Sequence, residues 1–178
     1  MPKYWRFLLN QRKKQGQDEL KDLKITFLFI GRTKDKNLDT LIKYYLARIS
    51  RYIPSQIREL KENHNIAAKD TAKKIQTEGE QFLAEIDKGD FTILLDEGGK
   101  EFASKDFSKF LSQKFNSGIK QINFIIGGPF GLSDKLREAS SVIISLSKFT
   151  FTHEISRLVL LEQVYRALTI IRGERYHY

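Results

Sequence analysis

The 178-residue sequence contains no cysteine, one methionine, one tryptophan and only three prolines. Without cysteine, the chain can form no disulfide framework, no thiolate zinc site and no thiol nucleophile. Only three histidines are present (His64, His153 and His177), which is too few for a histidine-rich metal site. No apolar run reaches the roughly 18 residues that a membrane-spanning helix needs, and no stretch near the start resembles a secretory signal. We therefore expect a cytoplasmic protein with no membrane partner and no metal.

The residues that are present can build a core, and they carry a strong positive charge. Hydrophobic residues make up 40% of the sequence and include 13 phenylalanines and 7 tyrosines, which excludes global disorder. Lysine and arginine number 31 against 22 aspartates and glutamates, so the net charge is +9 at pH 7. An excess of this size favours a polyanionic partner, because neutralising phosphates releases condensed counterions.

The chain divides into two regions of different character. Residues 1–23 join a short aromatic start to a Lys/Gln-rich stretch without strand-like alternation, so we interpret them as a basic extension that need not be ordered. From residue 24, short apolar runs alternate with amphipathic stretches. These predict strands over 24–31, 56–60, 91–96, 121–128 and 141–147, and helices over 38–52, 69–87, 104–118, 133–139 and 152–173. Such alternation predicts one α/β domain over 24–178, with a mostly parallel sheet.

Individual residues mark where several of these elements begin and end. Ser104 and Ser133 are predicted helix N-caps, because their hydroxyls can accept hydrogen bonds from amides of the first turn. Gly118 and Gly173 are predicted helix stops. The sequence Glu97-Gly98-Gly99 is expected to end the strand at 91–96.

Three familiar catalytic signatures nearly match and then fail, and a fourth is absent. Around Gly99, a P-loop would need glycine and serine or threonine where Leu94 and Glu101 stand. The segment HEISR at 153–157 resembles the zinc motif HExxH, but its arginine would repel the metal. A dinucleotide fingerprint over 126–131 lacks its first glycine, and no GxSxG elbow occurs. The sequence therefore argues against NTPase, zinc-protease, serine-hydrolase and NAD-dependent chemistry.

An unusual glycine-rich turn, GGPFGL, occupies residues 127–132. Its paired glycines carry no Cβ, so the backbone can approach a ligand closely and adopt positive φ. A tight strand-to-helix connection without any ligand would use the same residues. However, the segments 96–100 and 146–151 end two other expected strands, and parallel sheets bind ligands at that edge. We therefore predict one pocket there, whose glycine amides and apolar side chains (Leu95, Leu146, Phe149 and Phe151) suit a flat base such as adenine.

The helix expected at 152–173 is apolar nearly all round, so it must be buried in the monomer or in a subunit interface. It also carries Arg157, Glu162 and Arg166. One interpretation is an internal pair between Glu162 and one of the arginines, because buried charges need partners. The other is an active-site wall that Tyr176 and His177 complete from the end of the chain.

Four segments resemble a known family: LLDEGGKEFASKDFSKFL (94–111), FIIGGPFGL (124–132), LSKFTFTHEISRLVLLEQVYRA (146–167) and RGERYHY (172–178). They are similar to the bacterial 23S ribosomal RNA pseudouridine N3-methyltransferases, the large-subunit methyltransferase H type of the SPOUT superfamily. The resemblance spans about residues 24–178. It implies a SPOUT-type α/β knot with a C-terminal trefoil knot, an exception among protein folds. It also implies a homodimer that uses S-adenosylmethionine without a metal and methylates 23S rRNA within the large subunit or 70S ribosome.

The resemblance further implies roles for individual residues. Its methyl-donor contacts fall on Leu95, Gly127, Leu146, Ser147, Lys148, Phe149, Thr150 and Phe151. Tyr176 and His177 would complete the site from the tail. The chain departs from the family at Phe149, where a small residue or methionine is common, and at Thr152, where proline is common. It also lacks the basic last residue, and Arg175 could replace that phosphate contact.

Methylation of a ring nitrogen requires that this nitrogen lose its proton. His177 is the first candidate base because imidazole titrates near neutrality, and His153 is the second. Arg157, Arg166 and Arg175 are candidate contacts to RNA phosphates or uracil carbonyls. Two alternatives stay open: a SPOUT methyltransferase acting on a ribose 2′-hydroxyl or on tRNA, and a non-catalytic RNA-binding protein that uses its basic surface alone.

Overall fold

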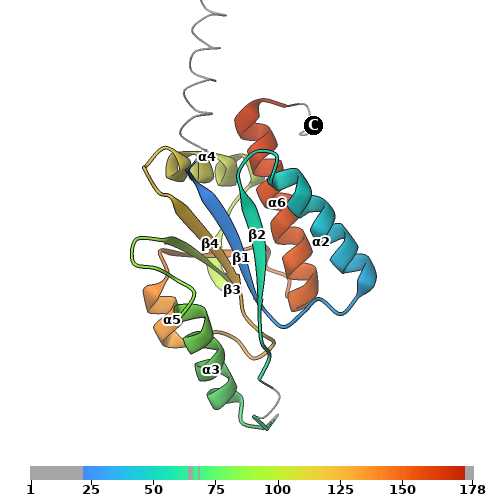
Figure 1. Ribbon diagram of the computed structural model, residues 1–178, viewed down its shortest axis with the longest axis vertical. Coiled ribbons are helices and arrows are strands. Elements are labelled where there is room, and N and C mark those ends of the chain that lie inside the picture. Colours follow the sequence, from blue (N-terminus) through green and yellow to red (C-terminus); the bar gives the residue numbers. More distant parts are fainter. Residues whose placement is uncertain (1–21, 64–65, 68, 175–178) are drawn as a thin grey trace, which may run out of the picture.

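Five parallel strands form one sheet in the spatial order β2-β1-β4-β3-β5 (Figure 1). They are β1 (Lys24–Ile30), β2 (Ser55–Leu60), β3 (Phe91–Glu101), β4 (Gln121–Ile126) and β5 (Val142–Ser145). Strand β1 is buried on both faces from its second residue onward, which agrees with its mostly apolar sequence. The computed structural model describes residues 22–63, 66–67 and 69–174, so the predicted extension lies almost wholly outside the described residues.

Helices pack on both faces of the sheet (Figure 1). One face carries α2 (Lys36–Ile49), α4 (Ser104–Phe115) and α6 (His153–Arg172), and the other carries α3 (Thr71–Leu83) and α5 (Asp134–Ala139). Because successive strand side chains point to opposite faces, Phe27 and Phe29 of β1 join the first core, whereas Leu28 and Ile30 join the second. The predicted α/β class with a parallel sheet is confirmed, and the trefoil knot stays a prediction. Within the described ranges, no helix combines the length and apolarity that crossing a bilayer requires.

The predicted helix ends are confirmed at α5 and α6 and wrong at the start of α4. Ser133 caps α5 by accepting a hydrogen bond from a first-turn amide at 3.3 Å. Gly173 ends α6 in the left-handed conformation, with φ of 68°. Ser104 is the first residue of α4 rather than its N-cap, which is Ala103 without a side-chain hydrogen bond. The Ser104 hydroxyl instead donates to Gln163 Oε1 of α6 at 3.2 Å, a contact between distant segments that local sequence does not encode.

Strand β3 continues beyond its predicted end. The sequence Glu97-Gly98-Gly99 does not stop it, because pairing with β5 resumes at Lys100 after an irregularity in the ladder. Gly99 makes this possible, since a Cβ there would lie 2.5 Å from the backbone carbonyl carbon of Ile144. The glycine therefore allows two backbones to approach closely, and the segment 96–100 is an irregular part of β3 rather than a free loop.

This close approach predicts different effects for two neighbouring substitutions. Gly99→Ala should lower the free energy of unfolding by about 1–3 kcal/mol, because its methyl group overlaps backbone that cannot move aside. Gly98→Ala is the matched control, since its Cβ would meet only Asp96 Oδ1, at 3.3 Å. Urea unfolding of both variants measures the difference. Equal stabilities of the two variants would contradict the close packing of β3 and β5 at this point.

Candidate active site

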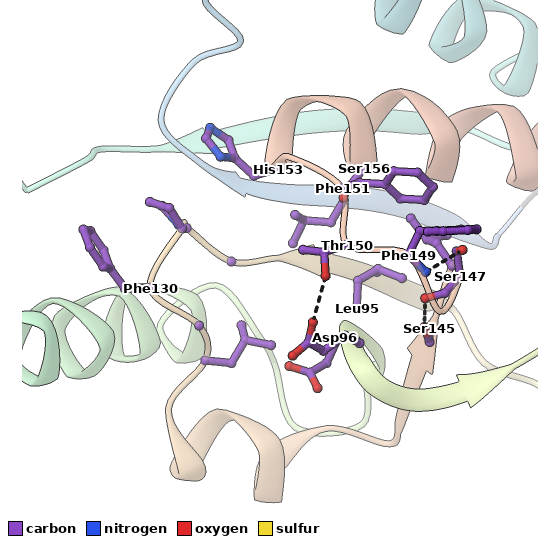
Figure 2. Close-up of a pocket in the computed structure, with 18 of the residues that line it drawn as sticks. Leu95, Asp96, Phe130, Ser145, Ser147, Phe149, Thr150, Phe151, His153 and Ser156 are labelled. Carbon is purple, nitrogen blue, oxygen red and sulfur yellow. Dashed lines mark hydrogen bonds between the residues drawn. The ribbon is translucent and has the colours of Figure 1, made fainter.

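A cavity of about 480 Å³ opens at the carboxyl ends of β3, β4 and β5 (Figure 2). Its lining includes residues from each of the three segments 96–100, 127–132 and 146–151. These segments are separated in the sequence, and the parallel order β4-β3-β5 brings them to one edge of the sheet. The structure thus forms a pocket where the strand ends predict one.

Most of the predicted methyl-donor contacts meet in this cavity. The lining includes Leu95, Gly127, Leu146, Ser147, Phe149, Thr150 and Phe151. Lys148 belongs to the same turn but is not part of the lining. Sequence reasoning placed the segment that begins at Asp96 at the pocket but gave Asp96 no role, and it did not assign Arg137 to the site, although both residues line it. The position of Asp96 directly after an apolar run could have indicated a site residue, whereas no nearby sequence feature indicates a role for Arg137.

The turn at 127–132 forms one wall of the cavity. A Cβ on Gly127 would lie 2.6 Å from Leu132 Cδ2 and 3.2 Å from the carbonyl oxygen of Gly131, so the turn has no room for a side chain at this position. Gly131 has a φ of 101°, which favours glycine. At its three glycines the turn therefore presents only backbone to the cavity.

The turn at 146–151 forms the opposite wall and is held by its own hydrogen bonds. The Ser145 hydroxyl donates to the Ser147 carbonyl at 2.9 Å, and the Phe149 amide donates to Ser147 Oγ at 3.0 Å (Figure 2). Thr150 Oγ1 donates to Glu97 Oε2 at 3.4 Å and so links the turn to β3. The Phe149 ring is 81% exposed. The backbone of this turn is thus fixed while its aromatic side chain faces outward.

A charged pair lies at the floor of the cavity. Arg137 of α5 donates to Asp96 Oδ2 at 2.7 Å, and the Gly98 amide donates to Asp96 Oδ1 at 3.0 Å. Burial by itself raises the pKa of Asp96, but these hydrogen bonds and the charge of Arg137 together lower it below its ordinary value. Asp96 therefore carries its negative charge at neutral pH, and the positive charge of Arg137 balances it within the cavity.

His153 lines the cavity from the first turn of α6. Burial lowers its pKa below the ordinary value of 6.5, and the positive charge of Arg157 lowers it further, against the opposite effect of Glu154. The imidazole is therefore neutral at pH 7. A neutral imidazole beside the cavity can accept a proton, so the structure is compatible with His153 as a base.

The lowered pKa of His153 predicts a pH-dependent stability. Below about pH 6.5 the unfolded chain binds a proton at this histidine before the folded protein does, so the free energy of unfolding falls as the pH falls. His153→Gln should remove this part of the decline and leave stability near pH 8 almost unchanged. Urea unfolding at several pH values measures it. An identical pH dependence in both proteins would contradict the assignment.

The prediction that Arg157 contacts RNA is wrong, because its side chain is fully buried. Its guanidinium group donates to the Ile30 carbonyl at 2.5 Å and to Thr33 Oγ1 at 3.1 Å, and it lies 4.9 Å from the centre of the Phe29 ring. Arg157 therefore ties the start of α6 to the end of β1. The predicted pair with Glu162 does not involve this arginine.

Arg166, rather than Arg157, forms the predicted ion pair with Glu162. Its Nε and one terminal nitrogen donate to Glu162 Oε1 at 3.1 and 2.6 Å, and Gln163 Nε2 donates to Glu162 Oε2 at 2.6 Å. The Arg166 side chain keeps 28% of its surface exposed, so an RNA contact stays a prediction. Arg175, Tyr176 and His177 lie outside the described residues.

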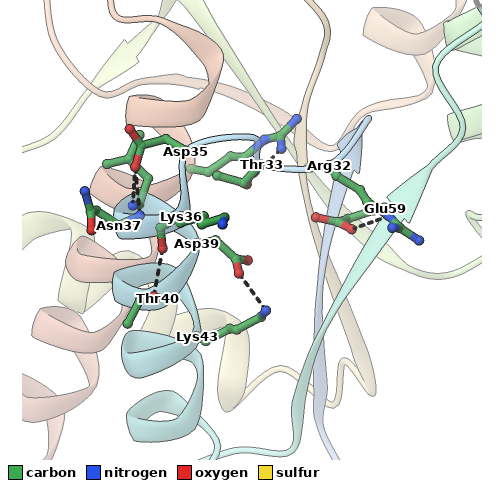
Figure 3. Close-up of polar contacts among 11 residues, drawn as sticks. Arg32, Thr33, Asp35, Lys36, Asn37, Asp39, Thr40, Lys43 and Glu59 are labelled. Atoms are coloured by element: carbon green, nitrogen blue, oxygen red, sulfur yellow. Dashed lines mark hydrogen bonds and ion pairs between the residues drawn. The ribbon is translucent and has the colours of Figure 1, made fainter.

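A second, larger hollow of about 1,220 Å³ lies between α2 and the edge strand β2. Its rim carries ion pairs between Arg32 and Glu59 at 3.9 Å and between Lys43 and Asp39 at 2.6 Å (Figure 3). Opposite charges therefore alternate there instead of forming a positive patch. None of the predicted site residues in the described part of the chain lines it. The cavity at the strand ends is the better candidate.

Comparison with known proteins agrees with this fold. The family described as "Predicted SPOUT methyltransferase" matches residues 23–177. One solved structure with a similar fold is described as a probable rRNA-methyltransferase from Porphyromonas gingivalis, with a TM-score of 0.51 and 12% identity over 84% of this chain and 70% of that one. At that identity the likeness concerns the fold alone. The fold and the family match together define a methyltransferase of the SPOUT class.

Relatives named "Ribosomal RNA large subunit methyltransferase H" identify the family within this class. The protein from Christiangramia forsetii is 41% identical over 157 residues, covering 86% of this chain and 98% of its own length. The protein from Flavobacterium psychrophilum is 42% identical over 156 residues, covering 88% and 99%. The chain therefore belongs to the family of ribosomal RNA large subunit methyltransferase H.

Proposed function

We propose that this chain transfers a methyl group from S-adenosylmethionine to N3 of a pseudouridine in 23S ribosomal RNA. One observation carries the proposal. The residues on which the family's methyl-donor contacts fall come from three separate segments, and nearly all of them line one cavity. A tight turn without a ligand would not require the other two segments to converge on it.

The cavity fits S-adenosylmethionine in size and chemistry. Its volume of about 480 Å³ lies within the range of roughly 300–1,000 Å³ that is usual for small-molecule sites. The apolar side chains of Leu95, Leu146 and Phe151 would hold the adenine, and the backbone of the turn at 127–132 would lie along its edge. When bound, S-adenosylmethionine supplies a methyl group that is already activated on a sulfonium ion.

The chain's own residues then have two tasks, to orient the acceptor base and to take up the proton from N3. Orientation of two reactants can account for roughly 7–11 kcal/mol of a barrier. His177 is our first candidate for the proton acceptor, and His153, neutral beside the cavity, is the second. Tyr176, Arg166 and Arg175 are proposed to position the RNA around them.

We infer that the substrate is the large subunit or the whole ribosome, in the cytoplasm, and that the enzyme is a homodimer. Within the described residues there is one small domain, which favours recognition of a folded particle by its shape. Phe149 and Phe151 are 81% and 37% exposed beside the cavity, and a second copy covering this rim would shield them.

Methylation of ribosomes from cells that lack this protein tests the proposal. Purified enzyme and S-adenosylmethionine should add one methyl group to a pseudouridine of 23S rRNA, located by mass spectrometry of nuclease fragments. A methyl group found on a ribose 2′-hydroxyl or on tRNA would show that the acceptor differs from the proposed one. No methylation, together with no calorimetric binding of S-adenosylmethionine in the presence of ribosomes, would favour an RNA-binding protein without catalysis.

A further inference from the structure

Helix α3 places a buried carboxylate behind one wall of the cavity. Glu78 is only 6% exposed, and no aspartate or other glutamate in the described ranges is buried to this degree. Its Oε2 atom is shielded from solvent and has no hydrogen-bond partner. Burying such a group opposes folding, because a charged carboxylate loses its hydration. A role in stability therefore does not account for Glu78.

The Glu78 carboxylate lies directly against the turn at 127–132. A Cβ on Gly128 would lie 2.7 Å from Oε2 and 3.0 Å from Oε1. Burial raises the pKa of Glu78 above its ordinary value, and nearby Glu62 adds to this, although the Gly128 amide and the charge of Lys74 lower it. The Gly128 backbone therefore lies directly against the carboxylate, and a side chain at residue 128 would require Glu78 to move.

Two further contacts join α3 to the same turn. Lys74, one helical turn before Glu78, places its Nζ 4.9 Å from the centre of the Phe130 ring. A Cβ on Gly79 would lie 2.1 Å from Ser133 Oγ, so the helix backbone touches the residue that caps α5. Helix α3 thus contacts the start, the middle and the far end of this segment.

We propose that Glu78 is a positioning residue of the methyl-donor site, which fixes the turn at 127–132 by accepting a hydrogen bond from the Gly128 amide. The inference rests on the proposed function, because it assigns Glu78 to the same cavity. Glu78 itself does not line the cavity, so it acts through the turn. Gly128 and its neighbours would otherwise have to be ordered when the methyl donor binds, which lowers affinity.

Two substitutions of Glu78 separate the hydrogen bond from the packing. Glu78→Leu has a similar size but no acceptor, and we expect the Kd for S-adenosylmethionine to rise about 10- to 100-fold, because the turn is no longer held and must be ordered when the ligand binds. Glu78→Gln keeps an acceptor and should stay within about threefold of the wild-type Kd. Glu80→Gln is the control, because Glu80 is an exposed residue of α3 whose side chain bonds only to Gln76 among the described contacts. Isothermal titration calorimetry measures all four proteins.

Amide hydrogen exchange provides a readout without any ligand. In the wild-type protein the Gly128 amide should exchange at least about 100-fold more slowly than an unstructured amide, and Glu78→Leu should remove most of this protection. The urea midpoint of Glu78→Leu should change little, because removing a buried carboxylate offsets the loss of an acceptor for the Gly128 amide.

The outcomes separate this inference from the proposed function. If wild-type protein binds no S-adenosylmethionine, the proposed function fails. The amide exchange of Gly128 still tests the contact between Glu78 and Gly128 in that case. Wild-type affinity in Glu78→Leu would overturn the positioning role. Equal losses in Glu78→Leu and Glu78→Gln would overturn the hydrogen bond as its cause. If Glu78→Leu does not fold, an unprotected Gly128 amide in the wild-type protein would overturn the inference by itself.

Discussion

His177→Ala is expected to lower the kcat for ribosome methylation by about 10²–10⁴-fold, the usual contribution of a general base. N3 of a pseudouridine carries a proton near neutral pH, and the reaction stalls unless a group of suitable pKa removes it. The Kd for S-adenosylmethionine should stay unchanged, because the base acts on the acceptor rather than on the donor. Single-turnover methylation over a range of pH, with calorimetry in parallel, measures both quantities.

The other two histidines provide the controls for this experiment. His64→Ala should retain full activity, because nothing in the account assigns it to the site. His153→Ala distinguishes the two candidate bases: a small loss supports His177, whereas a loss of about 10²-fold or more would transfer the role to His153. Unchanged turnover of His177→Ala at every pH would remove His177 from the mechanism.

Gly127→Val is expected to raise the Kd for S-adenosylmethionine by about 10- to 100-fold, corresponding to an overpacking cost of about 1–3 kcal/mol. Its Cβ would lie 2.6 Å from Leu132 Cδ2 and 3.2 Å from the Gly131 carbonyl oxygen, so the turn must open to admit the side chain. Opening would displace the wall along which we place the methyl donor. Calorimetric titration of the folded variant measures the change.

A second substitution tests the stated cause of this effect. Leu132→Ala removes the side chain that the new Cβ would strike, so the double variant Gly127→Val/Leu132→Ala should recover part of the lost affinity. Leu132→Ala alone provides the reference. Wild-type affinity in Gly127→Val would show that the turn does not bind the methyl donor.

Features that depend on short stretches of chain could be predicted from the sequence. The strands β1 and β4 are mostly apolar, as expected for strands that are buried on both faces of a parallel sheet. Ser133 begins α5 and Gly173 ends α6 through hydrogen bonds to residues only a few positions away. The convergence of three strand ends also follows from local pattern, since parallel strands share one carboxyl edge.

Features that depend on distant partners could not be predicted in this way. Arg157 looks like a surface cation on an apolar helix, but its partners lie at the end of β1, more than 120 residues away in the sequence. The sequence Gly98-Gly99 is typical of a strand end, but β3 continues because it pairs closely with β5 at this point. No nearby sequence feature indicates that Glu78 is buried, because its burial depends on the turn at 127–132 packing over α3.

A crystal of the protein soaked in S-adenosylmethionine tests the central claim most directly. The account predicts electron density for the adenosine between the glycine turn and the 146–151 turn, next to Leu95, with the methyl group directed toward solvent where an RNA base can reach it. Density for the adenosine at the hollow between α2 and β2, or none in the strand-end cavity at millimolar ligand, would contradict it.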